Sequence, residues 1–231
     1  MDTTLIGKGF YSLPRASKLV GADLRAIRRW MLGYSRRYKG EDRFSPPLWR
    51  TQYAGDELPE PSIGFKDLLE LRLVNAFVKH GVDLRVIRAT AEAASRLFGN
   101  DYPFTMKRFL TDGRTIFAEA VSEIGGESSL IDAAKGQYVF SEIIKPSLYA
   151  GIEYDGGAAM KWYPEKEGRS VVLDPQTQFG APIVADVSIP TDTLYASFLA
   201  EGRDRNAAAR IFDVEARHID VAVHFEERLA A

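Results

Sequence analysis

The sequence predicts an α+β protein that is mostly helical, and three observations lead to this fold class. Apolar residues recur at helical spacing in residues 13–31 and 65–97 and again in residues 191–229. Short apolar runs bounded by Gly, Pro or Asp lie between these stretches, and such runs are typical of strands. The chain has 231 residues, of which 45% are hydrophobic, so it can bury a sizeable core. We expect an N-terminal domain over residues 1–98, a β-rich connecting region over 99–170 and a C-terminal domain over 171–231.

Two short helices joined by a tight turn are expected near the start of the chain. Ser12 can cap the first helix, Gly21 ends it, and Asp23 can cap the second. The buried faces of the two helices would carry apolar residues at helical spacing: Leu13, Ala16, Leu19 and Val20, then Leu24, Ile27 and Met31. A pair of short helices with a glycine in the turn is the pattern of a helix-turn-helix.

A hairpin and a second pair of helices follow. Residues 33–62 show no helical period, and "KGED" between "YSRRY" and "RF" can turn a short hairpin that ends at Pro46-Pro47. A broad apolar stripe from Phe65 to Val78 predicts a long helix that stops at Gly81. Asp83 can cap the next helix, whose inner side would hold Leu84, Ile87, Ala91, Ala94 and Leu97. The N-terminal domain is therefore predicted to be a winged helix-turn-helix.

The rest of the chain is predicted to contain strands before it returns to helices. In the connecting region, "FLTDGRTIFAE" carries an Asp-Gly hairpin signal at 112–113, and "QYVFSEI" and "AAMKWYP" have the composition of strands. In the C-terminal domain, "SVVLD" and "APIVADVSIP" predict two strands. Three helices follow, at about 191–201, 204–212 and 216–229. This domain should thus combine two strands with a three-helix bundle.

Charge is unevenly distributed along the chain, whose net charge is -2. Residues 1–50 hold eleven Lys and Arg against four Asp and Glu, a balance of +7. The remainder holds 19 basic and 28 acidic residues, a balance of -9. A basic N-terminal segment joined to an acidic remainder indicates that the N-terminal end meets a polyanion and the rest does not.

The basic residues concentrate on the second helix and the hairpin. Arg25, Arg28 and Arg29 stand at i, i+3 and i+4, so they share a face, and no acidic residue lies near them on that helix. The candidate DNA-binding residues are Arg15, Lys18, Arg25, Arg28, Arg29, Arg36, Arg37, Lys39 and Arg43. Helix arginines could read guanines while the others contact phosphates. A solvated face that pairs with the acidic remainder is the alternative, but the position on a helix-turn-helix and hairpin favours DNA.

Other classes of site and location find little support in the sequence. The chain has no cysteine, so disulfides, thiolate metal sites and a thiol nucleophile are excluded. The three histidines, His80, His218 and His224, lack the spacing of a helical metal site, and no phosphate-binding or nucleophile motif occurs. We therefore expect no metal, no cofactor and no catalytic residue. Without a secretory signal or an apolar run long enough to cross a bilayer, a cytoplasmic location with no membrane contact is expected.

The N-terminal domain resembles the winged-helix domain of MerR-type regulators over about residues 9–98. The resemblance lies in "YSLPRASKLVGADLRAIRRWM", the hairpin, and "IGFKDLLELRLVNAFVKHGVDLRVIR". In that family, residues like "LRRW" lie on the recognition helix, and a pair of helices follows the wing. The resemblance implies that the chain binds operator DNA as a homodimer. The absence of cysteine sets it apart from the metal-sensing members.

The C-terminal domain resembles the small antitoxin domain of VapB-type antitoxins, which pair with PIN-like ribonuclease toxins. The residues that carry this resemblance are Asp174-Pro175, Gly180-x-Pro182, Ile189-Pro190-Thr191, Ala207-Ala208 and Ala222-x-x-Phe225-Glu226. Longer antitoxins of this group also have a MerR-like domain in front. Residues 192–231 carry five arginines against eight carboxylates, so these helices suit a protein partner better than DNA.

Together, the two resemblances imply an antitoxin of a type II toxin–antitoxin pair. It would neutralise a PIN-like ribonuclease toxin and bind operator DNA as an autorepressor. The alternative is a MerR-like transcriptional regulator whose residues 100–231 sense a small molecule. An enzyme is not expected.

Overall fold

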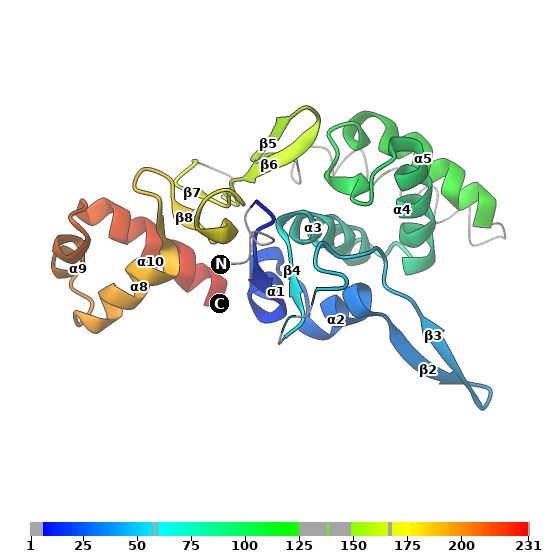
Figure 1. Ribbon diagram of the computed structural model, residues 1–231, viewed down its shortest axis with the longest axis horizontal. Coiled ribbons are helices and arrows are strands. Elements are labelled where there is room, and N and C mark those ends of the chain that lie inside the picture. The colour runs from blue at the N-terminus through cyan, green and yellow to red at the C-terminus, as the bar shows by residue number, and fades with distance from the viewer. Residues whose placement is uncertain are drawn as a thin grey trace. The chain divides into compact units, whose positions relative to one another are not determined.

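The computed structural model describes residues 7–124, 138, 149–165 and 168–230, apart from residues 57 and 59 and the side chain of Tyr38. The chain divides into two compact units. The N-terminal unit comprises residues 12–150 and 154–159, and the C-terminal unit comprises residues 1–11, 151–153 and 160–231. Helices predominate and the sheets are small, so the predicted α+β, mostly helical fold class is confirmed (Figure 1).

The N-terminal unit begins with the predicted helix-turn-helix, formed by α1 (Leu13–Val20) and α2 (Leu24–Leu32). The side chain of Ser12 caps α1, and Asp23 caps α2 by accepting from two backbone N–H groups. Gly21 ends α1 in the left-handed region, at φ 60° and ψ 41°, which glycine adopts without steric cost. The caps and the turn glycine are thus confirmed, and so is the burial of Leu13, Ala16, Leu19, Ile27 and Met31. Val20 and Leu24, which we expected on the buried faces, are only half-buried.

A buried amide from the third helix holds the turn between α1 and α2. Asn75 lies on α3 (Phe65–Lys79) and is nearly fully buried. Its side-chain Nδ2 donates to the backbone carbonyls of Val20, at 2.9 Å, and of Gly21, at 3.1 Å. Because these carbonyls belong to the helix end and the turn, Asn75 ties the orientation of the helix-turn-helix to α3.

The predicted hairpin, which we call the wing, is formed by β2 (Tyr34–Tyr38) and β3 (Glu41–Ser45). The strands pair in antiparallel register around a two-residue turn of Lys39 and Gly40. Both turn residues have positive φ, 51° and 87°, as the turns of tight two-residue hairpins require. Figure 1 shows the wing extending away from the helices of this unit.

The remaining helices of the N-terminal unit pack around a cluster of phenylalanines. These helices are α3, α4 (Leu84–Phe98), the 3-10 turn η1 (Pro103–Thr105) and α5 (Phe109–Ile124). The rings of Phe77 and Phe117 stack at 5.8 Å between centroids, and Phe104 meets Phe109 edge-on at 4.9 Å. The strands β1 (Tyr11–Ser12) and β4 (Ser62–Ile63) are two residues long.

Two expectations for this stretch are wrong. Asp112 and Gly113 do not turn a hairpin but lie inside α5. The helix forms because Phe109, Ile116, Phe117, Ala120 and Val121 bury one helical face. Leu97, which we expected to be buried on α4, is 54% exposed. The described part of the connecting region is accordingly richer in helix than expected.

The strand expected in "AAMKWYP" is confirmed as β6 (Ala158–Trp162), which forms a two-stranded sheet with β5 (Ile152–Asp155). The strand expected in "QYVFSEI" lies outside the described residues, apart from Tyr138.

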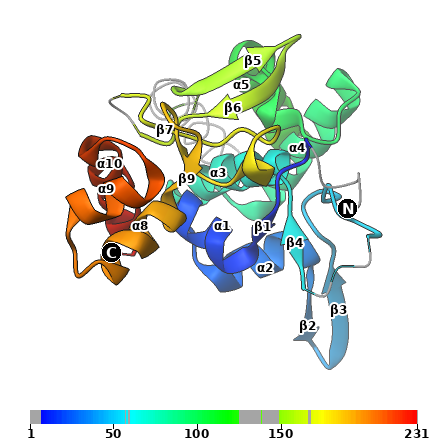
Figure 2. The same cartoon turned by 60° about the vertical axis from the view of Figure 1, so that its left-hand side comes forward.

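The C-terminal unit combines a three-stranded sheet with three helices. Figure 2 shows the three helices, α8, α9 and α10. The elements are β7 (Val171–Val172), the 3-10 turn η3 (Gln178–Gly180), β8 (Ile183–Val184), β9 (Ile189–Pro190), α8 (Thr191–Ala200), α9 (Arg205–Phe212) and α10 (Ala216–Ala230). The second expected strand is divided into β8 and β9, because the chain turns at 185–188 with Ser188 at φ 55°. The core of the C-terminal unit consists of Val184, Leu194, Ala208, Ala209, Ile219 and Ala222.

The first described residues of the chain form part of this C-terminal unit. Gly7 N–H donates to the carbonyl of Pro175, and the Tyr11 hydroxyl donates to the carbonyl of Gly180 at 2.6 Å. A side chain at Gly180 would place its Cβ 2.5 Å from the Tyr11 hydroxyl oxygen, so the close approach requires glycine. The compact C-terminal unit is therefore larger than the domain expected at 171–231.

Candidate nucleic-acid interface

The outer face of α2 presents two exposed arginines, Arg25 and Arg28. Ile27 and Met31 point inward and are nearly fully buried, which turns Arg25 and Arg28 to the exposed side of the helix. Among the described residues, neither Arg25 nor Arg28 has an ion pair, a side-chain hydrogen bond or an aromatic partner. An uncompensated guanidinium can meet a guanine edge or a phosphate without first giving up an internal contact.

Arg29, the third arginine of α2, instead connects the helix to the wing. Its guanidinium carbon lies 4.2 Å from the ring centroid of Tyr34, the first residue of β2. A hydrogen bond from Arg29 is the main cause that lowers the pKa of the Tyr34 hydroxyl. Because a stacked guanidinium restrains both partners, Arg29 is better placed to orient the wing than to read a base.

The wing divides its basic residues between two faces, because successive residues of a strand point to opposite sides. Arg36 stands directly opposite Arg43, and Arg37 stands opposite Asp42. Two like charges in opposite positions are unfavourable unless an anion lies between them. Arg43 also lies 4.0 Å from Glu41, but both side chains are more than half exposed, so this pair contributes little. The Arg36–Arg43 face is thus the better candidate for phosphate.

The other candidate cations are spread around these elements. Arg15 on α1 is half-buried, Lys18 on the same helix is exposed, and Lys39 lies at the tip of the wing. The structure thus brings Arg29 of α2 close to the wing, where Arg29 and Arg36 line the same groove. It leaves Arg37 on the opposite wing face.

A groove of about 540 Å³ lies beside α2 and the wing and contains two arginines that the sequence analysis missed. Arg29 and Arg36 line it together with Arg85 and Arg88 of α4. The Arg88 guanidinium donates to the backbone carbonyls of Pro47, at 2.7 Å, and Pro46, at 2.8 Å. Arg88 therefore fastens the segment after the wing to α4.

Arg85 and Arg88 belong to a short internal repeat. The sequence reads "GADLRAIR" at 21–28 and "GVDLRVIR" at 81–88. In both copies the glycine has positive φ, the aspartate caps a helix and the isoleucine is nearly fully buried. The last arginine differs, because Arg88 has two carbonyl acceptors whereas Arg28 has no partner among the described residues. Because this repeat is visible in the sequence, it could have identified Arg85 and Arg88 as the counterparts of Arg25 and Arg28.

Two buried carboxyl groups on α3 hold neighbouring segments, Asp67 the segment between the wing and α3 and Glu70 the turn η1. Asp67 accepts from the Trp49 indole N–H at 2.9 Å and from the backbone N–H groups of Gln52 and Gly64. Glu70 accepts from the backbone N–H of Thr105 through Oε1, and its Oε2 has no hydrogen-bond partner among the described residues. Burial raises the pKa of both carboxyls, and that of Glu70 lies well above its usual range.

Within the described ranges, no group of three or more His, Asp or Glu side chains is arranged to hold a metal ion. His218 is buried at the start of α10, and its Nε2 lies 3.6 Å from a carboxylate oxygen of Asp186. That separation is too long for a hydrogen bond. Over all the residues that the structure describes, no helix is long and apolar enough to cross a bilayer.

In the C-terminal unit, the residues that carry the antitoxin resemblance mostly stabilise the fold. Asp174 is buried, accepts from the backbone N–H of Gln176 and pairs with Lys161 at 3.1 Å. Thr191 is buried at the start of α8 and donates to the buried Glu226 of α10. With the Gly180 contact described above, these residues fix the turns and the packing of α8 on α10.

No family model matches the chain. The chain is 28% identical over 200 residues to a protein named "Putative antitoxin VapB45" from Mycobacterium tuberculosis (strain ATCC 25618 / H37Rv), an alignment that covers 78% of this chain and 81% of that protein. It is also similar to the X-ray crystal structure of Rv2018 from Mycobacterium tuberculosis, with a TM-score of 0.68 and 21% identity. That match covers 92% of this chain and 96% of the other chain, so nearly the whole fold has a counterpart of known structure.

Proposed function

We propose that this protein is the antitoxin of a type II toxin–antitoxin pair and that it represses its own operon as a homodimer. The observation that carries the proposal is the similarity to a protein named as an antitoxin over 78% of this chain. The protein would act by binding and would catalyse no reaction. We place it in the cytoplasm, where both proposed partners, operator DNA and a PIN-like ribonuclease toxin, would be.

The proposed DNA reader is the winged helix-turn-helix of the N-terminal unit. Arg25 and Arg28 would reach base edges in the major groove, because the first turns of a recognition helix lie closest to the bases. Arg36 and Arg43 would contact the flanking phosphates, together with Lys18 and Lys39. Arg25 and Arg28 are exposed and have no partner among the described residues, and Arg36 and Arg43 stand opposite each other on the wing, which supports this assignment.

The proposed toxin-binding part is the C-terminal unit. Its helices carry an excess of carboxylates, and Asp192, Glu201 and Asp213 are exposed. Such a surface suits a nuclease whose RNA-binding face is basic, because opposite potentials favour association.

Co-expression with the product of an adjacent PIN-like reading frame tests the antitoxin role. The chain should abolish the growth arrest caused by that nuclease and should copurify with it. Growth arrest that persists at equal expression, with no complex recovered, would contradict the proposal.

A triple variant tests the toxin-binding surface. Asp192→Asn, Glu201→Gln and Asp213→Asn together should weaken toxin binding by about tenfold at low salt, because three attractive charges are lost. The matched control carries Glu92→Gln, Glu119→Gln and Glu123→Gln, three exposed carboxylates of the N-terminal unit. Equal effects of the two triple variants would show that only net charge matters and would reject this surface.

A further inference from the structure

The groove beside α2 and the wing, which also reaches the start of α4, is strongly basic. Four guanidinium groups line it, those of Arg29, Arg36, Arg85 and Arg88, against one carboxylate, that of Asp83. The other lining residues that the structure describes are neutral: Trp30, Tyr34, Ser45, Leu48 and Leu84. The volume of about 540 Å³ lies in the range of small-molecule sites, so the groove can hold more than a single small ion.

The contacts of Arg29 and Arg88 leave their positive charges uncompensated. Arg29 stacks on the neutral ring of Tyr34, and Arg88 donates to two neutral backbone carbonyls of the segment after the wing. A guanidinium is always charged and has five N–H donors, so the two bonds of Arg88 leave further donors for an anion. These contacts also fix both side chains, which lowers the entropy cost of binding a ligand.

The carboxylate of the lining does not offset this charge. Asp83 lies 3.2 Å from Arg85, so these two side chains balance each other. With that pair counted as neutral and Arg36 left aside, Arg29 and Arg88 still give the groove an excess of two positive charges. The first turn of α4 also opens onto the groove, and the positive end of the helix dipole lies there.

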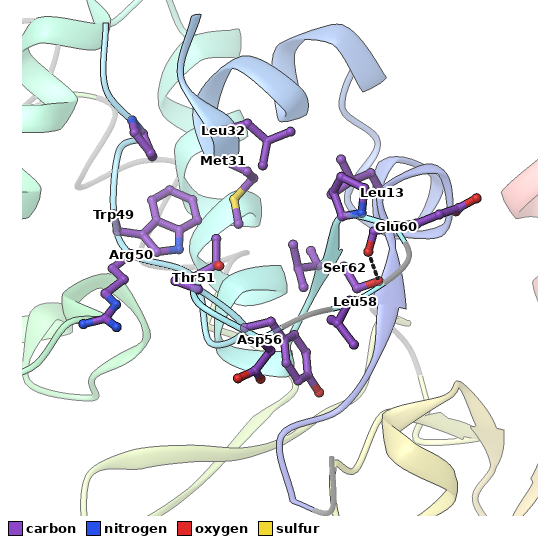
Figure 3. A pocket seen from close by; sticks show the side chains of 15 residues that line it. Leu13, Met31, Leu32, Trp49, Arg50, Thr51, Asp56, Leu58, Glu60 and Ser62 are labelled. Carbon is purple, nitrogen blue, oxygen red and sulfur yellow. Dashed lines mark hydrogen bonds between the residues drawn. The ribbon is translucent and has the colours of Figure 1, made fainter. Parts of the chain in front are cut away.

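A second hollow of the N-terminal unit, shown in Figure 3, lacks this charge pattern. It has a volume of about 700 Å³ and lies beside Met31 and Leu32 at the end of α2. Its wall is mainly apolar, and its charged lining residues are two carboxylates and one guanidinium. An excess of guanidinium groups therefore distinguishes the groove beside the wing from this larger pocket.

We propose that the groove beside the wing binds a phosphate group, held by Arg88 of α4 together with Arg29 of α2. Guanidinium groups match the geometry of phosphate oxygens, and the hydroxyls of Tyr34 and Ser45 in the lining are further possible donors. Two sources carry this chemistry: a backbone phosphate of DNA and a free phosphorylated small molecule. Only the first source rests on the proposed operator binding, and neither depends on toxin neutralisation.

Isothermal titration calorimetry with inorganic pyrophosphate, at constant ionic strength, tests the site in the full-length protein. The wild type should show saturable binding with one site per chain. Arg88→Gln should weaken that binding by about tenfold, because a charge-assisted hydrogen bond is lost. The matched control is Arg96→Gln, at an exposed arginine of the same helix outside the groove, which should bind pyrophosphate as the wild type does.

Asp83→Asn should have the opposite effect. Asparagine still caps α4, whereas the groove loses its carboxylate, so pyrophosphate should bind about threefold more tightly. Structural damage would not tighten binding, so this variant separates a charge effect from misfolding. Arg88→Lys keeps the charge but loses the planar fork and should lie between Arg88→Gln and the wild type. Melting temperatures identify any variant that fails to fold.

Binding to a duplex of arbitrary sequence distinguishes the two sources, because a phosphate contact does not depend on base sequence. If the groove holds a backbone phosphate, Arg88→Gln should reduce the slope of log K against log salt by about 0.9, and pyrophosphate should compete with the duplex. If the ligand is a free phosphorylated molecule, Arg88→Gln should lose pyrophosphate affinity and keep the wild-type slope. Either result supports a phosphate site.

Two results would overturn the proposal. One is a wild type without saturable pyrophosphate binding, combined with an Arg88→Gln variant whose duplex slope equals that of the wild type. The other is an equal loss of pyrophosphate affinity in Arg88→Gln and Arg96→Gln, which would show that only net charge matters. A failure of the antitoxin role alone would appear in the growth-rescue assay and leave these measurements unchanged.

Discussion

At Arg28 and Arg29, two neighbouring residues of the same type have different environments. Arg28 is exposed and has no partner among the described residues, whereas Arg29 stacks on Tyr34 of the wing. Helical spacing placed both on the outer side of α2, which the structure confirms. Helical spacing could not predict that the two side chains have different environments, because the contact between Arg29 and Tyr34 depends on where the wing folds back.

We therefore expect Arg28→Ala and Arg29→Ala to affect DNA binding in different ways. Arg28→Ala should cost about 1–3 kcal/mol for the operator and reduce discrimination against operators with a substituted guanine. Arg29→Ala should weaken binding to all sequences alike, because it releases the wing. Competition binding with operator and base-substituted duplexes separates the two results. Identical specificity profiles for the two variants would contradict this division of roles.

Glu70 is a buried carboxyl whose contribution to the stability of the folded state depends on pH. Burial raises the pKa of Glu70 well above its usual value of 4.5, so the folded state holds this proton more tightly than the unfolded state. The stability that this group contributes is complete below the unfolded pKa and is lost as pH rises through the folded pKa. Glu70→Gln mimics the neutral form and can still accept from the Thr105 N–H.

Urea unfolding from about pH 5 to about pH 8 measures this effect. We expect the stability of Glu70→Gln relative to wild type to increase as the pH rises. Glu92→Gln, at an exposed position of α4, is the control and should show no such trend. A constant difference between Glu70→Gln and wild type over this range would show that Glu70 is not protonated preferentially in the folded state.

Among the helices and strands, the sequence predicted those elements best whose local signals agree with their tertiary contacts. Ser12, Asp23 and Asp83 cap helices as expected, because a side-chain cap is a contact within four residues of chain. The Asp-Gly signal at 112–113 failed because burial of the α5 face outweighed a local turn preference. The support that Asn75 gives to the helix-turn-helix joins residues more than fifty positions apart, and no periodicity predicts such a bond.

Replacing Asn75 by Ala tests how strongly α3 holds the helix-turn-helix. The carbonyls of Val20 and Gly21 would lose their donor, so Asn75→Ala should lower the free energy of unfolding by about 1–3 kcal/mol. Operator affinity should fall even though no DNA contact is removed. The control is Asn206→Ala, at an exposed asparagine of the C-terminal unit, for which urea unfolding should match wild type. Wild-type stability of Asn75→Ala would show that the turn holds its orientation without α3.

At the scale of the whole molecule, the charge asymmetry predicted which end of the chain could face DNA, but chain order did not predict the compact units. Residues 7–11 fold with the C-terminal unit through Tyr11 and Gly180, although they directly precede α1. Deleting residues 171–231 would therefore leave the Tyr11 hydroxyl without its acceptor. Point variants on exposed residues test the toxin-binding surface more cleanly than such a truncation.

We propose that the basic face of the N-terminal unit reads the operator while the toxin binds elsewhere. The most direct test is the operator dissociation constant of a protein carrying Arg28→Glu and Arg29→Glu, measured as its complex with the toxin at physiological salt. We predict that this variant still rescues growth and copurifies with the toxin but no longer binds operator DNA, because two attractive charges on α2 become repulsive. Operator affinity equal to that of the wild-type complex would contradict the account, and the cluster would then be a solvated face.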